Sequence, residues 1–131
     1  MNNGINVNSE IGKLKSVLLH RPGAEVENIT PDTMKQLLFD DIPYLKIAQK
    51  EHDFFAQTLR DNGAETVYIE NLATEVFEKS SETKEEFLSH LLHEAGYRPG
   101  RTYDGLTEYL TSMPTKDMVE KVYAGVRKNC L

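Results

Sequence analysis

The sequence has little cysteine, no long apolar run and no cluster of basic residues. Its one cysteine, Cys130, excludes an internal disulfide, which suits a reducing compartment. Apolar runs such as Val17-Leu18-Leu19 are far too short to cross a bilayer, and residues 1–5 carry no features of a signal peptide. The net charge of −6 disfavours non-specific binding to nucleic acid or anionic membranes. We therefore expect a cytoplasmic protein without nucleic-acid or membrane partners.

The first half of the chain has the pattern of an α/β unit. The 131 residues are 39% apolar and 27% charged, which is ordinary for a soluble domain. Strands are predicted at residues 14–20 and 66–69, and helices beginning at Pro31, after a Thr30 cap, and at Pro43. Helices between two strands of one sheet imply parallel pairing. Residues 1–71 are thus expected to run strand, helix, helix, strand.

The second of these helices should present one apolar face and stop at Asn62-Gly63. The residues of that face recur at spacings of three and four: Leu45, Ala48, His52, Phe55 and Leu59. On the first strand, the apolar Leu18 between Val17 and Leu19 predicts burial on both faces of the sheet.

Residues 72–131 predict helices alone. The expected stretches are residues 72–79, 83–95, around 106–113, and 115–126. The expected N-caps are Asn71, Thr83 and Thr115, with Glu86 completing a capping box with Thr83. These helices can bury their apolar stripes against one another as an α-helical bundle.

The predicted sheet looks unfinished. Two strands are marginal in water, and parallel strands are normally covered on both faces. We expect the missing layers to come from the rest of a longer chain or from a partner subunit. The alternative is a further strand near Ile5-Asn6-Val7.

Three kinds of side chain are candidates for chemistry. Cys130 is the one available thiol, but a catalytic cysteine needs a positioned base, and an incidental terminal cysteine is the favoured reading. His90 and His93 have a helical i, i+3 spacing that suits a metal, with Glu86 and Glu94 nearby, although a solvated helix face is favoured. No phosphate-binding glycine loop is present, and we expect no cofactor and no metal.

His52 and the pair Asp40 and Asp41 remain ambiguous. His52 could act as a base, but a core histidine with hydrogen-bonded ring nitrogens is favoured. The two aspartates could serve acid–base chemistry or hold a cation, although capping the following helix is favoured.

Several segments in combination resemble the start of the arginine deiminase family. They are Ser9–Lys15 running into Val17–Gly23, Leu37-Leu38-Phe39-Asp40-Asp41-Ile42-Pro43, Glu51-His52-Asp53 with Phe55, and Ala124-Gly125-Val126-Arg127. The resemblance covers nearly the whole chain but only the beginning of a family member. It implies an incomplete module of a five-bladed α/β propeller (pentein-like) over residues 1–71 and an α-helical insertion over residues 72–131.

The resemblance also implies the parent activity. Family members hydrolyse L-arginine to L-citrulline and ammonia through an amidino-cysteine intermediate, and their catalytic Cys and His lie downstream of this chain. Cys130 does not match the family nucleophile, so the chain alone is expected to be inactive. By resemblance Leu38 touches the substrate from a lid loop that also carries Leu37, Phe39, Asp40 and Asp41.

An alternative class is a helical protein-interaction module without catalysis. A chain continuing into a histidine and a glycine-rich cysteine motif would favour the enzyme. A homo-oligomer is possible, since uncovered apolar strands promote association.

Overall fold

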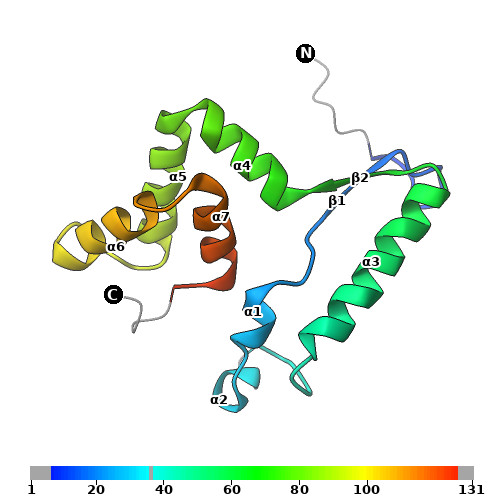
Figure 1. Ribbon diagram of the computed structural model, residues 1–131, viewed down its shortest axis with the longest axis horizontal. Coiled ribbons are helices and arrows are strands. Elements are labelled where there is room, and N and C mark those ends of the chain that lie inside the picture. The colour runs from blue at the N-terminus through cyan, green and yellow to red at the C-terminus, as the bar shows by residue number, and fades with distance from the viewer. Residues whose placement is uncertain (1–6, 36, 127–131) are drawn as a thin grey trace.

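The computed structural model describes residues 7–35 and 37–126, which form a mixed α/β structure that is mostly helical (Figure 1). The elements in chain order are β1 (Ser16–Leu19), α1 (Ala24–Glu27), α2 (Pro31–Met34), α3 (Leu45–Asp61), β2 (Glu65–Tyr68), α4 (Ile69–Lys79), α5 (Ser81–Glu94), α6 (Arg101–Thr111) and α7 (Thr115–Ala124). The strands and α3 lie on one side of the molecule and α4–α7 gather on the other (Figure 1). Among the helices of the described residues, none has the length and apolar character needed to cross a bilayer.

The two strands pair in parallel, as the sequence predicted. The register places Ser16 opposite Glu65 and Leu19 opposite Tyr68. Strand β1 is shorter than expected, whereas β2 has the expected length but is shifted by one residue, because it begins at Glu65 and Ile69 already belongs to α4. The connection between them also contains one more helix than predicted, the single-turn α1.

The helices that cross from β1 to β2 start and stop close to their sequence signals. The Thr30 hydroxyl accepts from the Thr33 amide at 3.3 Å, and the Thr33 hydroxyl accepts from the Thr30 amide at 3.0 Å. This reciprocal cap holds the first turn of α2, which ends at Met34. Helix α3 begins at Leu45 and not at Pro43, and it ends before Gly63, whose φ of +81° suits glycine.

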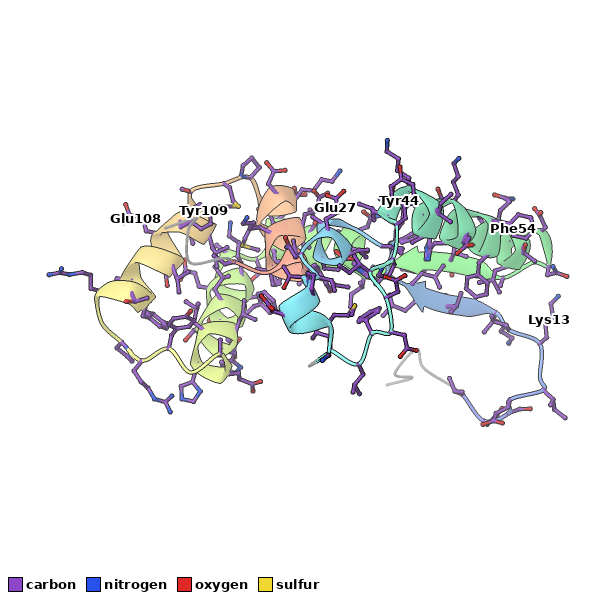
Figure 2. All side chains as sticks on the ribbon, turned by 90° about the horizontal axis from the view of Figure 1, so that it is seen from below. Lys13, Glu27, Tyr44, Phe54, Glu108 and Tyr109 are labelled. Carbon is purple, nitrogen blue, oxygen red and sulfur yellow. The ribbon has the colours of Figure 1, made fainter. Side chains whose placement is uncertain are left out.

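The sheet and α3 both carry large exposed apolar side chains. Ala56 is fully buried on α3, but Phe55 is 52% and Phe54 75% exposed, so the predicted burial of Phe55 is wrong for this chain. Figure 2 shows Phe54 on α3, at the end of the molecule away from Glu108 and Tyr109. Leu18 is 55% exposed, which also corrects the expectation of burial on both faces of β1. Within residues 7–35 and 37–126 no further layer covers these side chains.

The helical part has its own core. Its buried cluster draws on α4, α5, α6 and α7 and consists of Phe77, Leu88, Leu110, Met118 and Val119. The rings of Phe77 and Phe87 pack with centroids 4.9 Å apart. Helix α4 follows β2 without a loop, since Tyr68 ends the strand and is also the N-cap residue of α4.

The caps of these helices differ from the predictions. Helix α4 begins at Ile69, so Asn71 lies inside it and is not its cap. Helix α5 is capped by Ser80, whose hydroxyl accepts from the Thr83 amide at 3.2 Å, and the predicted capping box of Thr83 with Glu86 is therefore wrong. Thr115 is the first residue of α7 and not its cap. Helices α4 and α5 begin earlier than predicted, at Ile69 and Ser81, whereas α7 begins at Thr115, where its predicted stretch begins.

Candidate functional site

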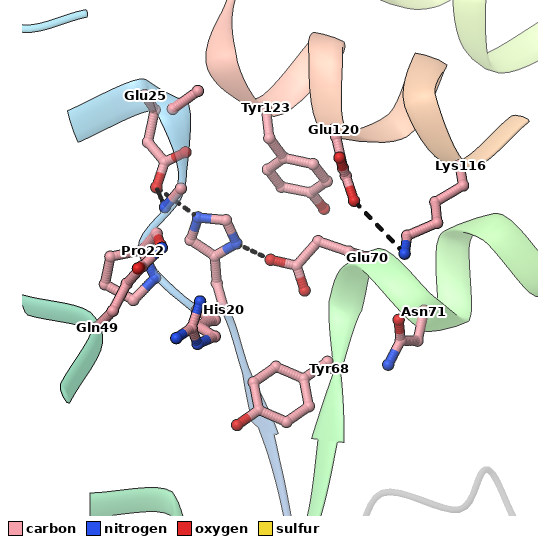
Figure 3. Close-up of a pocket in the computed structure, with 13 residues that line it drawn as sticks. His20, Pro22, Glu25, Gln49, Tyr68, Glu70, Asn71, Lys116, Glu120 and Tyr123 are labelled. Carbon is pink, nitrogen blue, oxygen red and sulfur yellow. Dashed lines mark hydrogen bonds and ion pairs between the residues drawn. The ribbon is translucent and has the colours of Figure 1, made fainter. Parts of the chain in front are cut away.

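The carboxyl ends of β1 and β2 open into a cavity of about 600 Å³. Parallel pairing places the residues that follow each strand at the same edge of the sheet, where ligand sites of α/β folds commonly lie. The cavity walls come from the turn after β1, the start of α1, α3, the start of α4, and α7. It thus lies where the α/β part meets the helical part (Figure 3).

His20 occupies the centre of this region, between two carboxylates. Its Nε2 lies 3.0 Å from Glu25 Oε1 on α1, and its Nδ1 contacts Glu70 Oε1 in the first turn of α4. The imidazole also stacks on Tyr123 of α7, with ring centroids 5.2 Å apart and an interplanar angle of 20°. Figure 3 shows the ring held between the two glutamates beside Tyr123. We call His20, Glu25, Glu70 and Tyr123 the His20 cluster.

The electrostatics of the His20 cluster favour a charged imidazole. Partial burial lowers the pKa of His20, but its hydrogen bonds to Glu25 and Glu70 outweigh burial and raise that pKa above its ordinary value. Burial raises the pKa of Glu25, but hydrogen bonds from the Gly23 amide and from His20 outweigh it and lower that pKa. Desolvation raises the pKa of Tyr123. The arrangement therefore suits one imidazolium shared by carboxylates.

The turn after β1 is also bound to α3. The Arg21 guanidinium donates through Nε and Nη2 to the Asp53 carboxylate, at 2.7 and 2.9 Å. The hydrogen bond from Arg21 lowers the pKa of Asp53. The Gln49 amide donates to the Pro22 carbonyl at 2.9 Å. Two side chains of α3 therefore fix the turn that carries His20, and this two-pronged geometry favours arginine over lysine at position 21.

The expected lid residues lie apart from this cavity. Leu38 is 92% exposed with a φ of 59°, and none of the residues from Leu37 to Asp41 lines the cavity. A leucine with positive φ is unusual, because its Cβ crowds the backbone there. The expectation that Asp40 or Asp41 caps the next helix is wrong: α3 has no side-chain cap, and Asp41 accepts from the neighbouring Ile42 amide at 2.8 Å.

The remaining candidates do not converge on one place. His52 is half-buried, and its Nε2 lies 3.3 Å from the Tyr68 hydroxyl, as for a packed and hydrogen-bonded histidine. His90 and His93 are both exposed on α5. In the part of the chain that the structure describes, no three His, Cys, Asp or Glu side chains are grouped to hold a metal ion. Cys130 lies outside the described residues.

Sequence reasoning did not single out the His20 cluster. Its members lie as far apart as His20 and Tyr123, and Glu25 and Glu70 resemble ordinary surface glutamates in sequence. One signal was present: His20 directly follows β1 and Glu70 closely follows β2, and the ends of paired parallel strands meet.

The structure defines the chain as an α/β protein with a short parallel sheet and an attached group of helices. A family model described as arginine deiminase matches residues 35–130. The chain therefore belongs to the arginine deiminase family.

Similar proteins carry the same name. The chain is 98% identical over 129 residues to the arginine deiminase of Lactococcus lactis subsp. lactis (strain IL1403). The matched region covers 98% of this chain and 32% of that protein. It is 60% identical over 129 residues to the arginine deiminase of Latilactobacillus sakei, covering 98% of this chain and 31% of that protein. It is 58% identical over 127 residues to the arginine deiminase of Limosilactobacillus fermentum (strain NBRC 3956 / LMG 18251), covering 97% and 31%. The chain thus spans about a third of the length of these relatives.

Proposed function

We propose that this chain is the N-terminal part of an arginine deiminase, which hydrolyses L-arginine to L-citrulline and ammonia, and that the chain by itself is inactive. The observation that carries the proposal is the 98% identity over 129 residues to a protein named arginine deiminase, of which the chain spans 32%. At this identity the shared residues adopt the same fold. The catalytic Cys and His therefore belong to the part of the parent protein that this chain does not span. The working compartment is the cytoplasm.

The unfinished sheet supports the same proposal. Residues 1–71 are a partial propeller module and residues 72–131 an α-helical insertion, and the rest of the propeller covers the exposed face of β1 and α3. Leu18, Phe54 and Phe55 are each more than half exposed in the chain as described. Large exposed apolar side chains on a marginal two-stranded sheet and on the helix beside it favour a covering layer.

The reaction proceeds at a cysteine supplied by the remainder of the parent protein. Its thiolate attacks the guanidinium carbon of L-arginine, ammonia leaves, and water then hydrolyses the amidino-cysteine to citrulline and restores the thiolate. A histidine of the remainder moves the protons. His20 is not suited to that role, because both of its ring nitrogens face carboxylates within the His20 cluster.

The contribution of this chain to the reaction is an apolar lid. Leu38 is the residue that contacts the substrate when the lid closes, with Leu37 and Phe39 beside it. Asp40 and Asp41 hold the end of the loop at the solvent-exposed surface. The near-complete exposure of Leu38 supports this role, since its side chain is available to bury itself against a bound ligand. An apolar lid keeps bulk water away from the covalent amidino-cysteine intermediate while the lid is closed.

The test compares citrulline production by the complete polypeptide and by residues 1–131. We expect turnover from the first and none from the second, whether or not residues 1–131 carry Cys130→Ser. Turnover by residues 1–131 that disappears in the Cys130→Ser variant would make Cys130 a nucleophile and overturn the proposal. A complete polypeptide that is folded and produces no citrulline would overturn it as well.

A further inference from the structure

His20 makes two contacts that one neutral imidazole cannot both make as hydrogen bonds. Nε2 faces Glu25 Oε1 at 3.0 Å, and Nδ1 faces Glu70 Oε1. A neutral imidazole carries one N–H, so its second nitrogen would present a lone pair to a carboxylate oxygen. A doubly protonated ring donates to both. The geometry of the His20 cluster therefore requires one proton more than the neutral ring supplies.

The cluster joins segments that are far apart in sequence. His20 ends β1 and Glu25 belongs to α1, whereas Glu70 and Tyr123 belong to α4 and α7 of the helical part. A second contact lies next to it, where the Asn28 side-chain amide donates to the Ala124 carbonyl. Beyond the direct passage from β2 into α4, the contacts of α1 with α7 and the His20 cluster hold the helical part against the α/β part.

The other charged groups around the ring come from every element packed against it. Arg21, in the same turn, is paired with Asp53 of α3. On α7, Lys116 and Glu120 line the cavity and pair with each other at 3.8 Å. On β2, the Tyr68 hydroxyl lies 3.3 Å from His52. These neighbours pair among themselves, whereas Glu25 and Glu70 are 30% and 19% exposed and direct their carboxylates at His20.

We propose that the His20 cluster is a proton-dependent clasp between the α/β part and the helical part, closed when the imidazole carries two protons and loosened when it loses one. The neutral ring keeps one hydrogen bond and turns the other contact into a repulsion between a lone pair and a carboxylate. The 36% exposure of the His20 side chain lets water deliver and remove the proton. Loosening separates α7 from α1 and widens the cavity between them.

The test follows hydrogen exchange of α1 and α7 in the complete polypeptide between pH 5.5 and pH 8.5, with rates corrected for the intrinsic effect of pH. We expect the protection of peptides from both helices to fall by roughly three- to tenfold across this range, as for the loss of one charge-assisted hydrogen bond at a half-exposed site. Peptides from the core of α5 serve as the internal reference and should not change.

Two variants and one control separate the clasp from a general effect of pH. Glu70→Gln should keep α1 and α7 protected at pH 8.5, because its amide can either accept from the ring or donate to the neutral nitrogen. His20→Gln should make protection independent of pH, while the exposed His90→Gln on α5 should behave like the parent. An unchanged protection profile in the parent protein would overturn the proposal, as would a pH response in Glu70→Gln equal to that of the parent. If His20→Gln does not fold, the Glu70→Gln variant still decides the test. Its expected result is retained protection at pH 8.5, which an unfolded protein cannot show.

Discussion

Replacing Leu38 with alanine in the complete polypeptide should weaken the use of L-arginine and leave the fold intact. The change removes three carbon groups beyond Cβ, and at about 0.8 kcal/mol for each buried group the largest loss is roughly 2.4 kcal/mol. Full burial against the substrate therefore corresponds to a fall of about fiftyfold in kcat/KM, and half burial to a fall of about sevenfold. The same leucine is 92% exposed in this chain, so the free energy of unfolding should change by no more than about 0.5 kcal/mol. Alanine also has a Cβ, and the strain of the positive φ at this position is retained.

The assay measures citrulline release at several arginine concentrations, together with a urea unfolding curve. Leu72→Ala is the matched control, because Leu72 lies on α4, is 43% exposed, and loses the same carbon groups outside the lid. Unchanged kinetics for Leu38→Ala would remove Leu38 from the site. A loss of activity accompanied by an equal loss of stability would show that the residue supports the fold instead.

Three further predictions concern stability. Leu110→Ala should lower the free energy of unfolding of the helical part by about 2–5 kcal/mol, because Leu110 is 1% exposed in the core; a urea midpoint equal to that of the parent would contradict the core assignment. Thr30→Ala should cost about 1 kcal/mol through loss of the α2 cap, seen as faster amide exchange in α2, whereas unchanged exchange would mean that the cap is not formed in solution. The stabilisation from the His20 cluster should be greatest between about pH 4.5 and 6.5. The pKa of His20 is raised in the folded protein, so its contribution is lost as the pH rises through that folded pKa. The pKa of Glu25 is lowered, so its contribution is lost as the pH falls through the folded pKa of Glu25. Urea unfolding across pH would refute this if the His20→Gln and parent proteins showed the same pH profile.

Local signals in the sequence were sufficient for the order and type of most elements. The parallel pairing of β1 with β2 was predicted because helices separate the two strands, and Thr30-Pro31 and Asn62-Gly63 marked real helix boundaries. Several helix starts were missed by a few residues. Helix α4 begins at Ile69, which had been assigned to the strand, Ser80 caps α5 ahead of Thr83, and α3 begins two residues after Pro43.

The burial of side chains on the sheet and on α3 could not be read from the pattern. Leu18 and Phe55 have the spacing of buried residues, but both are more than half exposed in the chain as described. Periodicity assigns a residue to a face of a helix or strand, but it does not tell which segment of the polypeptide packs there.

The sequence did not predict the candidate site. The lid role of Leu38 came from the resemblance and stays a prediction, and the loop that carries Leu38 does not line the cavity beside His20. The His20 cluster depends on register between strands and on how α7 packs against α1, which are long-range contacts with no local signature. The contacts of Glu25 and Glu70 with His20 can be recognised only once that packing is known.

The most direct test of the central claim is amide protection in β1, measured in residues 1–131 alone and in the complete polypeptide. β1 pairs with β2 along one edge, and among the described residues no strand pairs with its other edge. If the remainder of the protein completes the sheet, the amides of Ser16–Leu19 should be at least about a hundredfold more protected in the complete polypeptide, since burial inside a larger sheet raises the free energy of local opening toward that of global unfolding. Equal protection in the two polypeptides would mean that the sheet is already complete in this chain, and the account would be wrong.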